Sequence, residues 1–159
     1  MEHLVARGRK SIYYIKDRDT DSAKSKRDGF LEAMRRNGLE FADHVLEAGE
    51  TLASGMETVQ ALLAQGIVPD GIVCGEDLTA AGALKALLRA GLRVPGQVAV
   101  VGFNNSDYAH LCEPVLTSVD NKPEQVALLC VQLLESSIER SEAYSSVVLQ
   151  PELAQGETS

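Results

Sequence analysis

Two short polar clusters are the first candidates for chemistry in this sequence, at residues 75–77 and 104–105. The sequence Gly-Glu-Asp follows an apolar run at residues 70–74, and Asn-Asn follows a second apolar run at residues 98–103. Between the runs, residues 78–90 carry apolar side chains at helical spacing, which predicts a strand, a helix and a parallel strand. Ligands bind beyond the carboxyl ends of the strands in open parallel sheets. The side chains of both clusters are therefore expected in a ligand-binding crevice.

Each of these side chains also has an ordinary structural explanation. Asp77 stands where a residue would cap the following helix, and Asn104 could be a turn residue that bonds its own backbone. Glu76 only accepts hydrogen bonds when ionised, so it suits a cationic or donor-rich ligand. The acidic pair could instead hold Mg²⁺ for phosphoryl chemistry. The chain has no Walker loop, no Gly-x-Ser-x-Gly elbow and only scattered histidines, so we do not expect an enzyme, a catalytic residue or a resident metal or cofactor.

Composition narrows the class of protein. With 159 residues and 45% hydrophobic content, the chain can form a domain of ordinary size with a buried core. A net charge of -8 argues against direct binding to a phosphate backbone. The three cysteines lack zinc-site spacing and are expected to be reduced and mostly buried. No apolar run approaches the ~18 residues of a membrane span and no signal peptide begins the chain, so we expect a cytoplasmic location and no membrane contact.

Hydrophobic periodicity predicts alternating strands and helices along the chain. Alternation of this kind predicts an α/β fold, in which a parallel sheet is flanked by helices on both faces in three layers. The loop at residues 106–114 is expected to be irregular. The predicted helices are residues 1–9, 22–37, 54–65, 78–90 and 123–138, and the predicted strands are residues 11–16, 41–46, 70–74, 98–103, 116–119 and 146–150.

The last predicted helix is apolar on more than one face, which indicates burial on more than one face. The residues from Pro151 onward are polar and are expected to form a frayed tail.

Several segments resemble the effector-binding domain of the lactose-repressor-type (LacI/GalR) bacterial transcription regulators. The matching segments are, in order, AAGAL at residues 80–84, GLRVP at residues 91–95, VAVVGFNN at residues 98–105, PVLTSV at residues 114–119 and LQPEL at residues 149–153. The resemblance covers nearly the whole chain. It implies one half of a type I periplasmic-binding-protein-like fold, whose two subdomains enclose the ligand in a cleft.

The resemblance also implies how this chain relates to a whole regulator. Residues 1–150 would be a partial sensor domain, mostly its C-terminal subdomain, with the helix at residues 123–140 belonging to a first subdomain that is otherwise absent. Residues 151–159 would be the polar tail. DNA would be bound only through a helix-turn-helix head outside this chain. The unpartnered apolar helix leads us to expect a homodimer or larger assembly, formed by exchanging that helix between copies.

The resemblance places ligand contacts at seven positions. Lys26 falls where the family has an arginine, and it cannot make the planar two-pronged contact of a guanidinium; the alternative is a solvated lysine. Lys26 and other contact positions carry a different type of residue from the one usual in the family. Either the effector is therefore not a common sugar or ligand binding has been lost. The candidate positions are Ser22, Lys26, Glu50 (where some members have a ring-stacking aromatic residue), Glu76, Asp77, Asn104 and, near the crossing segment, Asn121.

By this resemblance the chain is the part of a cytoplasmic regulator that senses a small-molecule effector, a sugar or another small polar metabolite, and couples its binding to DNA affinity. Two alternatives remain open. One is a solute-binding protein of a transport system. The other is a dimerisation module that has lost ligand binding, for which the helices at residues 54–65 and 78–90 could supply the face.

Overall fold

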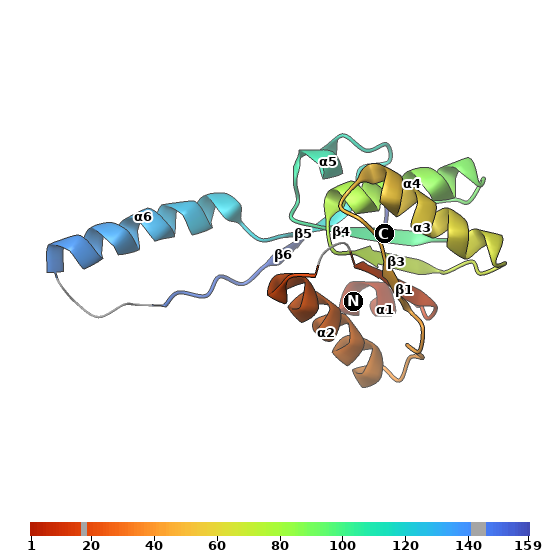
Figure 1. The fold of residues 1–159 in the computed structure, drawn as a ribbon, viewed down its shortest axis with the longest axis horizontal. Coiled ribbons are helices and arrows are strands. Elements are labelled where there is room, and N and C mark those ends of the chain that lie inside the picture. Colours follow the sequence, from red (N-terminus) through yellow and green to blue (C-terminus); the bar gives the residue numbers. More distant parts are fainter. Residues whose placement is uncertain (17–18, 141–145) are drawn as a thin grey trace.

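A single sheet organises the computed structural model, which describes residues 1–16, 19–140 and 146–159 (Figure 1). Its strands lie in the order β2-β1-β3-β4-β5-β6. The first five pair in parallel and β6 pairs antiparallel with β5. The strands are β1 (Ile12–Lys16), β2 (Val45–Glu47), β3 (Gly71–Cys74), β4 (Ala99–Phe103), β5 (Thr117–Asp120) and β6 (Glu152–Ala154).

Helices cover both faces of this sheet. Neighbouring residues of β4 point to opposite faces: Val100 packs in the core beneath α3 and α4, whereas Ala99 packs in the core beneath α1 and α2. The predicted three-layer α/β architecture is therefore confirmed, with β6 as an antiparallel edge. The helices are α1 (Glu2–Ala6), α2 (Asp21–Arg36), α3 (Leu52–Ala64), α4 (Asp77–Arg89), α5 (Asp107–His110) and α6 (Pro123–Arg140).

The continuous apolar runs seen in the sequence follow from this layering. Every residue of β1 is buried, and Ile72 and Val100 in the neighbouring strands are 0% exposed. A parallel strand covered by helices on both faces has no solvent side, so its sequence shows no alternation of polar and apolar residues.

Two glycines bring α3 and α4 close together above the sheet. A Cβ atom on Gly82 would lie 2.1 Å from the carbonyl oxygen of Leu52, and one on Gly55 would lie 2.3 Å from that of Thr79. Any side chain at these positions would push the helices apart. The close contact fixes the start of α4, where Glu76 and Asp77 lie.

The end of the chain differs from the sequence prediction. Residues 146–150 do not form a strand; β6 lies at Glu152–Ala154 instead and pairs Val119 with Leu153. The expected frayed tail is also wrong, because Thr158 is 0% exposed and its hydroxyl donates to the carbonyl oxygen of Val100 at 2.7 Å. The polar composition of the tail suggested fraying. Instead, the Thr158 hydroxyl forms hydrogen bonds with the backbone of the sheet, accepting from the N–H of Thr117 and donating to Val100.

Three further details differ from the expectations. Part of the predicted irregular loop forms the short helix α5, and β2 begins later than predicted. The cysteines are free, as expected, but they are not mostly buried: Cys74 is buried, Cys112 is partly exposed and Cys130 is exposed on α6.

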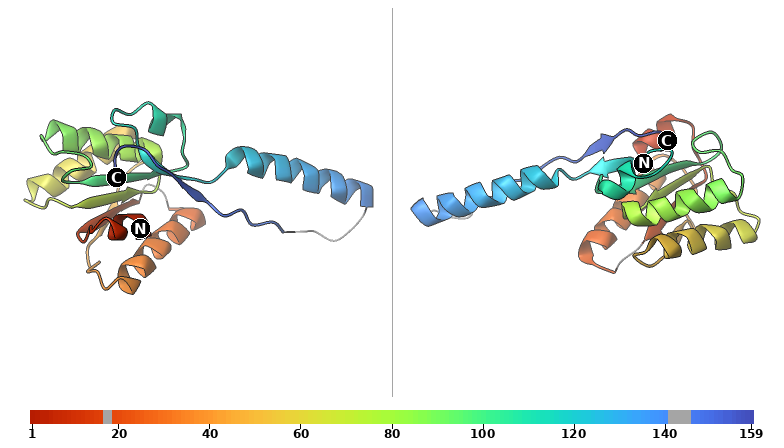
Figure 2. Two further views of the ribbon diagram at one scale, coloured as in Figure 1. Left: turned by 180° about the vertical axis from the view of Figure 1, so that it is seen from behind. Right: turned by 90° about the horizontal axis from the view of Figure 1, so that it is seen from above.

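Helix α6 extends from the body as an arm, and the chain returns alongside it toward β6 (Figures 1 and 2). The prediction that this helix is buried on more than one face is wrong for the described chain. No other helix or strand that the structure describes covers the side of α6 that faces away from the returning chain, which we call its outer side. The predicted exposure of apolar surface is confirmed. The exposed large apolar residues of α6 are Val126 (44%), Leu128 (59%), Val131 (54%), Leu134 (61%) and Ile138 (73%).

Among the residues that the structure describes, no helix combines the length and the apolar character that crossing a membrane would require.

Candidate functional site

Four of the candidate side chains meet at the carboxyl ends of β3 and β4. Lys26 Nζ, from α2, lies 3.6 Å from Glu76 Oε1, and Asn104 Nδ2 donates a hydrogen bond to Glu76 Oε2. Asn121 Nδ2, just beyond β5, donates to Asn104 Oδ1 at 3.0 Å. We call this chain of contacts the wall network. It joins four segments of the fold into one polar surface: α2, the start of α4, the loop after β4 and the segment after β5.

Lys26 is held against this surface and is not a solvated helix-face lysine. Its ammonium donates to the carbonyl oxygen of Gly75 at 2.8 Å and lies 4.1 Å from the centroid of the Phe103 ring. Its side chain is 16% exposed. A cation over an aromatic face is attracted by the ring quadrupole, so Phe103 is a partner that the sequence reasoning missed.

Asp77 has a different role from helix capping. Glu76 occupies the N-cap position of α4, without a side-chain capping bond, and Asp77 is 1% exposed. Its Oδ2 accepts bonds from the backbone N–H of Ser106 at 2.7 Å and from its hydroxyl at 2.9 Å, and Oδ1 accepts from the hydroxyl of Ser118 at 2.6 Å. The capping alternative is therefore wrong, since the carboxylate joins the start of α4 to the loop after β4 and to β5.

Gly102 creates the space for this carboxylate. A Cβ atom at Gly102 would lie 2.2 Å from Asp77 Oδ1. The sequence held two signals for the arrangement: a glycine inside an apolar strand, which often marks close approach of another group, and a serine, Ser118, inside a buried strand.

Asn104 and Asn105 adopt left-handed backbone conformations, with φ of 99° and 51°. Asn104 uses its side chain in the wall network, so it is not a turn residue that bonds its own backbone. Asn105 receives support from β5, because its N–H donates to the hydroxyl of Ser118 at 3.0 Å and its Nδ2 donates to Asp120 Oδ2 at 3.3 Å. Uncommon backbone conformations supported on several sides occur often at functional sites.

A hollow of about 160 Å³ opens beside the wall network. Tyr108 of α5 is 51% exposed and brings an aromatic ring to it. Glu50 also lines the hollow, whereas Ser22 is exposed in the first turn of α2 and does not. The lining residues are Glu50, Glu76, Asp77, Leu78, Asn104, Ser106 and Tyr108.

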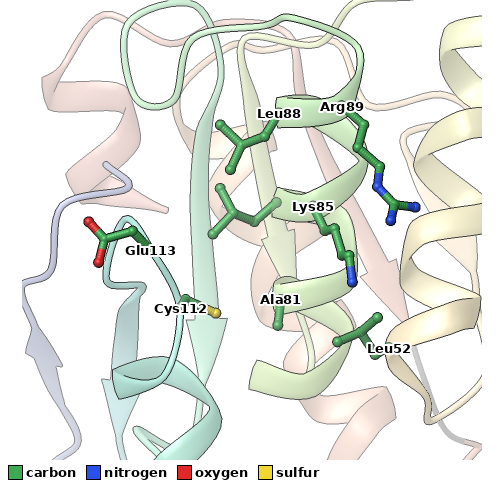
Figure 3. A pocket seen from close by; sticks show the side chains of 8 residues that line it. Leu52, Ala81, Lys85, Leu88, Arg89, Cys112 and Glu113 are labelled. Carbon is green, nitrogen blue, oxygen red and sulfur yellow. The ribbon is translucent and has the colours of Figure 1, made fainter.

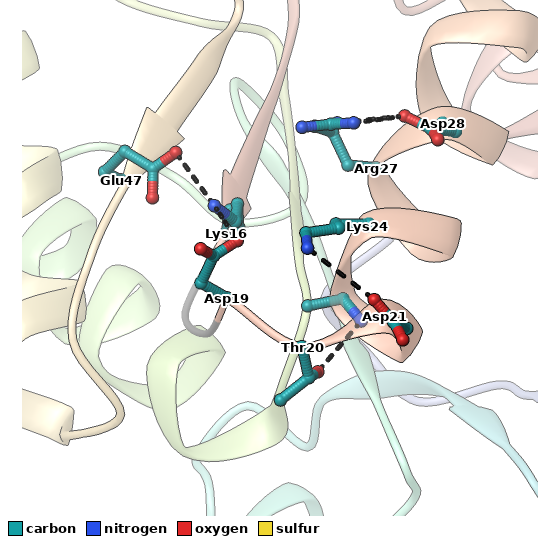
Figure 4. Close-up of polar contacts among 9 residues, drawn as sticks. Lys16, Asp19, Thr20, Asp21, Lys24, Arg27, Asp28 and Glu47 are labelled. Atoms are coloured by element: carbon teal, nitrogen blue, oxygen red, sulfur yellow. Dashed lines mark hydrogen bonds and ion pairs between the residues drawn. The ribbon is translucent and has the colours of Figure 1, made fainter.

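A second polar cluster fixes the start of α2, from which Lys26 extends (Figure 4). The side chain of Lys16 is 9% exposed and pairs with Glu47 at 3.3 Å and Asp19 at 3.4 Å. Burial lowers the pKa of Lys16. The hydrogen bonds to Glu47 and Asp19, together with the negative charges of both carboxylates, raise it by more, so the net shift of the pKa is upward. Thr20 then caps α2 by accepting from the N–H of Ala23 at 3.2 Å.

A larger groove of about 420 Å³ lies on the outer side of α4 (Figure 3). Its floor is apolar, with Glu113 on one side and Lys85 and Arg89 on the other. Burial, with a smaller contribution from the charge of Asp77, raises the pKa of the Cys112 thiol in this groove. The lining residues are Leu52, Ala81, Leu84, Lys85, Leu88, Arg89, Cys112 and Glu113.

Comparison with known proteins agrees with this fold and topology. Residues 1–159 match the model of the periplasmic binding protein-like domain family. The chain belongs to this family. The HTH-type transcriptional repressor PurR of Pasteurella multocida is 32% identical over 155 residues, which cover 96% of this chain and 46% of that protein. The probable repressor ExuR of Bacillus subtilis is 26% identical over 152 residues, covering 94% of this chain and 46% of that protein.

Solved structures of LacI-type regulators have the same fold. The cellobiose complex of the transcriptional regulator CelR has a TM-score of 0.88 and 28% identity, covering 99% of this chain and 49% of that one. A dimeric Lac repressor with an 11-residue C-terminal deletion has a TM-score of 0.92 and 25% identity, covering 99% of this chain and 58% of that one. The predicted resemblance is confirmed, and this chain spans about half the length of the curated relatives.

Proposed function

We propose that this chain is the effector-sensing part of a cytoplasmic transcription regulator. The wall network carries the proposal, because it gathers a cation, a carboxylate and two amides at the carboxyl edge of a parallel sheet, where such folds bind ligands. The names of the relatives support it, since PurR is named a transcriptional repressor, ExuR is named a probable one, and a similar structure contains cellobiose.

In this proposal the chain forms one side of a ligand cleft. Residues 1–150 are mostly the C-terminal subdomain of a sensor, and the arm α6 packs on the other subdomain through its exposed apolar side. Binding in the cleft favours one arrangement of the subdomains, and a helix-turn-helix head elsewhere in the regulator reads that change as altered DNA affinity. The protein performs no chemical reaction on its ligand.

The chemistry of the wall fits a small polar ligand with vicinal donors and acceptors. Lys26 Nζ and Glu76 Oε1 are 3.6 Å apart, so a ligand hydroxyl between them would accept from the ammonium and donate to the carboxylate. The ring of Tyr108 at the hollow could cover an apolar face of the ligand. A sugar or a similar polyhydroxylated metabolite meets both requirements.

A thermal-shift screen with sugars, nucleosides, amines and polyols tests this function. We expect one class to raise Tm, and Asn104→Ala and Lys26→Ala to abolish that rise. Asn37→Ala is the matched control, since Asn37 lies at the far end of α2, where its side chain bonds the carbonyl oxygen of Ala33. A ligand-induced shift that survives unchanged in both wall variants would contradict the proposed site.

The groove beside α4 supports a second, compatible function as a dimerisation surface. Its acidic side at Glu113 and basic side at Lys85 are complementary when two copies meet about a two-fold axis, because each side then faces the opposite charge. Leu88, 41% exposed, supplies apolar contact. The solved relatives include Lac repressor dimers.

Sedimentation velocity tests the groove. We expect Glu113→Lys to weaken association, and the double variant Glu113→Lys with Lys85→Glu to restore it by exchanging the two charges. Leu88→Glu should weaken association without rescue. An unchanged oligomeric state in all three variants would exclude this surface.

A further inference from the structure

Asn104 and Asn105, which we call the tip of β4, lie between the hollow and the base of the arm, residues 120–122. Within the described chain, α6 leaves the body directly after residues 120–122, and the returning segment rejoins it at β6 (Figures 1 and 2). The orientation of the arm therefore depends on how residues 120–122 are held.

Asn104 and Asn105 hold this base together. Asn121 donates to Asn104, and Asn105 donates to Asp120. Asp120 Oδ1 in turn accepts from the backbone N–H of Lys122 at 2.7 Å, and Lys122, with φ of 55°, forms an ion pair with Glu152 of β6. Both segments that lead to the arm are thus linked to the tip of β4.

The charge of Glu76 sets the direction of the Asn104 amide. A carboxylate only accepts hydrogen bonds, so Asn104 must turn its NH₂ group toward Glu76. Its carbonyl oxygen then faces the other way and is available to accept from Asn121. A change at Glu76 would therefore alter the bond between Asn104 and Asn121.

We propose that Asn104 is a positioning residue that transmits the state of Glu76 to residues 120–122, and so to the orientation of α6. The inference rests on the proposed function in one respect, that a ligand binds beside Glu76. A ligand donor that takes the place of the Asn104 NH₂ group at Glu76 Oε2 frees the amide to rotate and weakens its bond with Asn121. The arm then becomes less restrained.

The test uses the ligand-free chain, so its outcome is independent of whether any effector is found. Spin labels on the exposed native Cys130 of α6 and on Gln60→Cys of the exposed side of α3, in a Cys112→Ser background, report the orientation of the arm. Dilution with unlabelled protein removes distances between copies. Hydrogen exchange of the Lys122 amide reports the base of the arm.

We expect Glu76→Gln to broaden the distance distribution, because a glutamine amide can present either its NH₂ group or its oxygen and so no longer fixes the direction of the Asn104 amide. Exchange at Lys122 should speed up about fivefold, the effect of losing the one modest hydrogen bond between Asn104 and Asn121. Asn104→Ala should act similarly, and adding Glu76→Gln to it should have no further effect, because the connection is already broken. Glu40→Gln, which removes an exposed carboxylate beyond the C-terminal end of α2, is the control.

Changes confined to residues near 76 in the folded Glu76→Gln variant would mean that Glu76 has only a local structural role and would overturn the proposal. Additive effects of the two substitutions at Lys122 would also overturn it, since they would show separate routes to the arm. Circular dichroism and thermal melts of each variant establish that the comparison is between folded proteins.

Discussion

Ser118 donates a hydrogen bond of 2.6 Å to the carboxylate of Asp77, a residue 41 positions earlier in the chain. The bond joins β5 to the first turn of α4, and the second oxygen of the same carboxylate holds the loop after β4 through Ser106. These three segments carry Asn121, Glu76 and Asn104. One buried carboxylate therefore fixes the relative positions of three of the four residues of the wall network, all but Lys26.

Asp77→Ala should destabilise the protein by about 3 kcal/mol, because it leaves buried donors of Ser106 and Ser118 without an acceptor. Urea unfolding followed by circular dichroism measures the loss. Asp28→Ala is the control, since the Asp28 carboxylate also accepts a hydrogen bond, from Arg27 at 2.7 Å, but is exposed; surface pairs contribute about 0–1 kcal/mol. Equal losses in the two variants would contradict a structural role for Asp77.

Gly102→Ala should cost about 2 kcal/mol, because its Cβ would lie 2.2 Å from Asp77 Oδ1 and one of the two must move. In the double variant with Asp77→Ala, the loss of stability should be smaller than the sum of the two single losses, since the clashing oxygen is gone. Gly29→Ala in α2, where a Cβ meets nothing within 4 Å, should instead stabilise by about 0.5–1 kcal/mol. Additive losses in the double variant would show that the strain at Gly102 has another source.

The body of the fold was predictable because its strands and helices carry their own periodicity. The run at β4 and the amphipathic pattern of α4 depend on residues close in sequence, and alternation of such elements leaves few topologies. The end of the chain was not predictable, because Thr158 is ordered by bonds to Thr117 and Val100, which are distant in sequence. The burial of α6 was overestimated because a sequence shows apolar faces but not which partner covers them.

The candidate site was predictable in position and less so in detail. Topology and the family resemblance predicted that Lys26, Glu76 and Asn104 lie at one edge of the sheet, and the structure places them there. The direction of a side chain depends on its surroundings, so the turn of Asp77 toward Ser118 could not be seen. Tyr108 was missed because α5 lies in a segment whose polar and turn residues predicted only an irregular loop.

The outer side of α6 should make the 159-residue chain self-associate. Leu128, Val131, Leu134 and Ile138 are exposed and lie on one side of the helix by their spacing, and apolar surface of this kind favours association. Leu134→Glu should shift sedimentation toward a smaller species, whereas Gln132→Glu, which adds the same charge at another exposed position of α6, should not. A monomer at high concentration of the unsubstituted chain would contradict this expectation.

His3 connects the two ends of the described chain in a way that depends on its protonation. Arg7 Nη1 donates to His3 Nδ1 at 3.2 Å, so the neutral ring carries its proton on Nε2, which lies 2.9 Å from the hydroxyl of Ser159. Burial, the charge of Arg7 and the positive amino terminus all lower the pKa of His3 in the folded protein. Protonation at Nδ1 would break the bond from Arg7 and place two positive charges together.

This lowered pKa makes stability depend on pH with a definite sign. Below about pH 6.5, the usual histidine pKa, the unfolded chain binds a proton that the folded chain takes up only at lower pH, so stability falls as the pH decreases through this window. His3→Gln should therefore lose less Tm than the unsubstituted protein between about pH 7.5 and 5.5. His110→Gln, at the exposed histidine of α5, should retain the full decrease. If both variants follow the unsubstituted protein, the acid sensitivity arises from groups other than His3, and the contact with Ser159 does not depend on the charge of the ring.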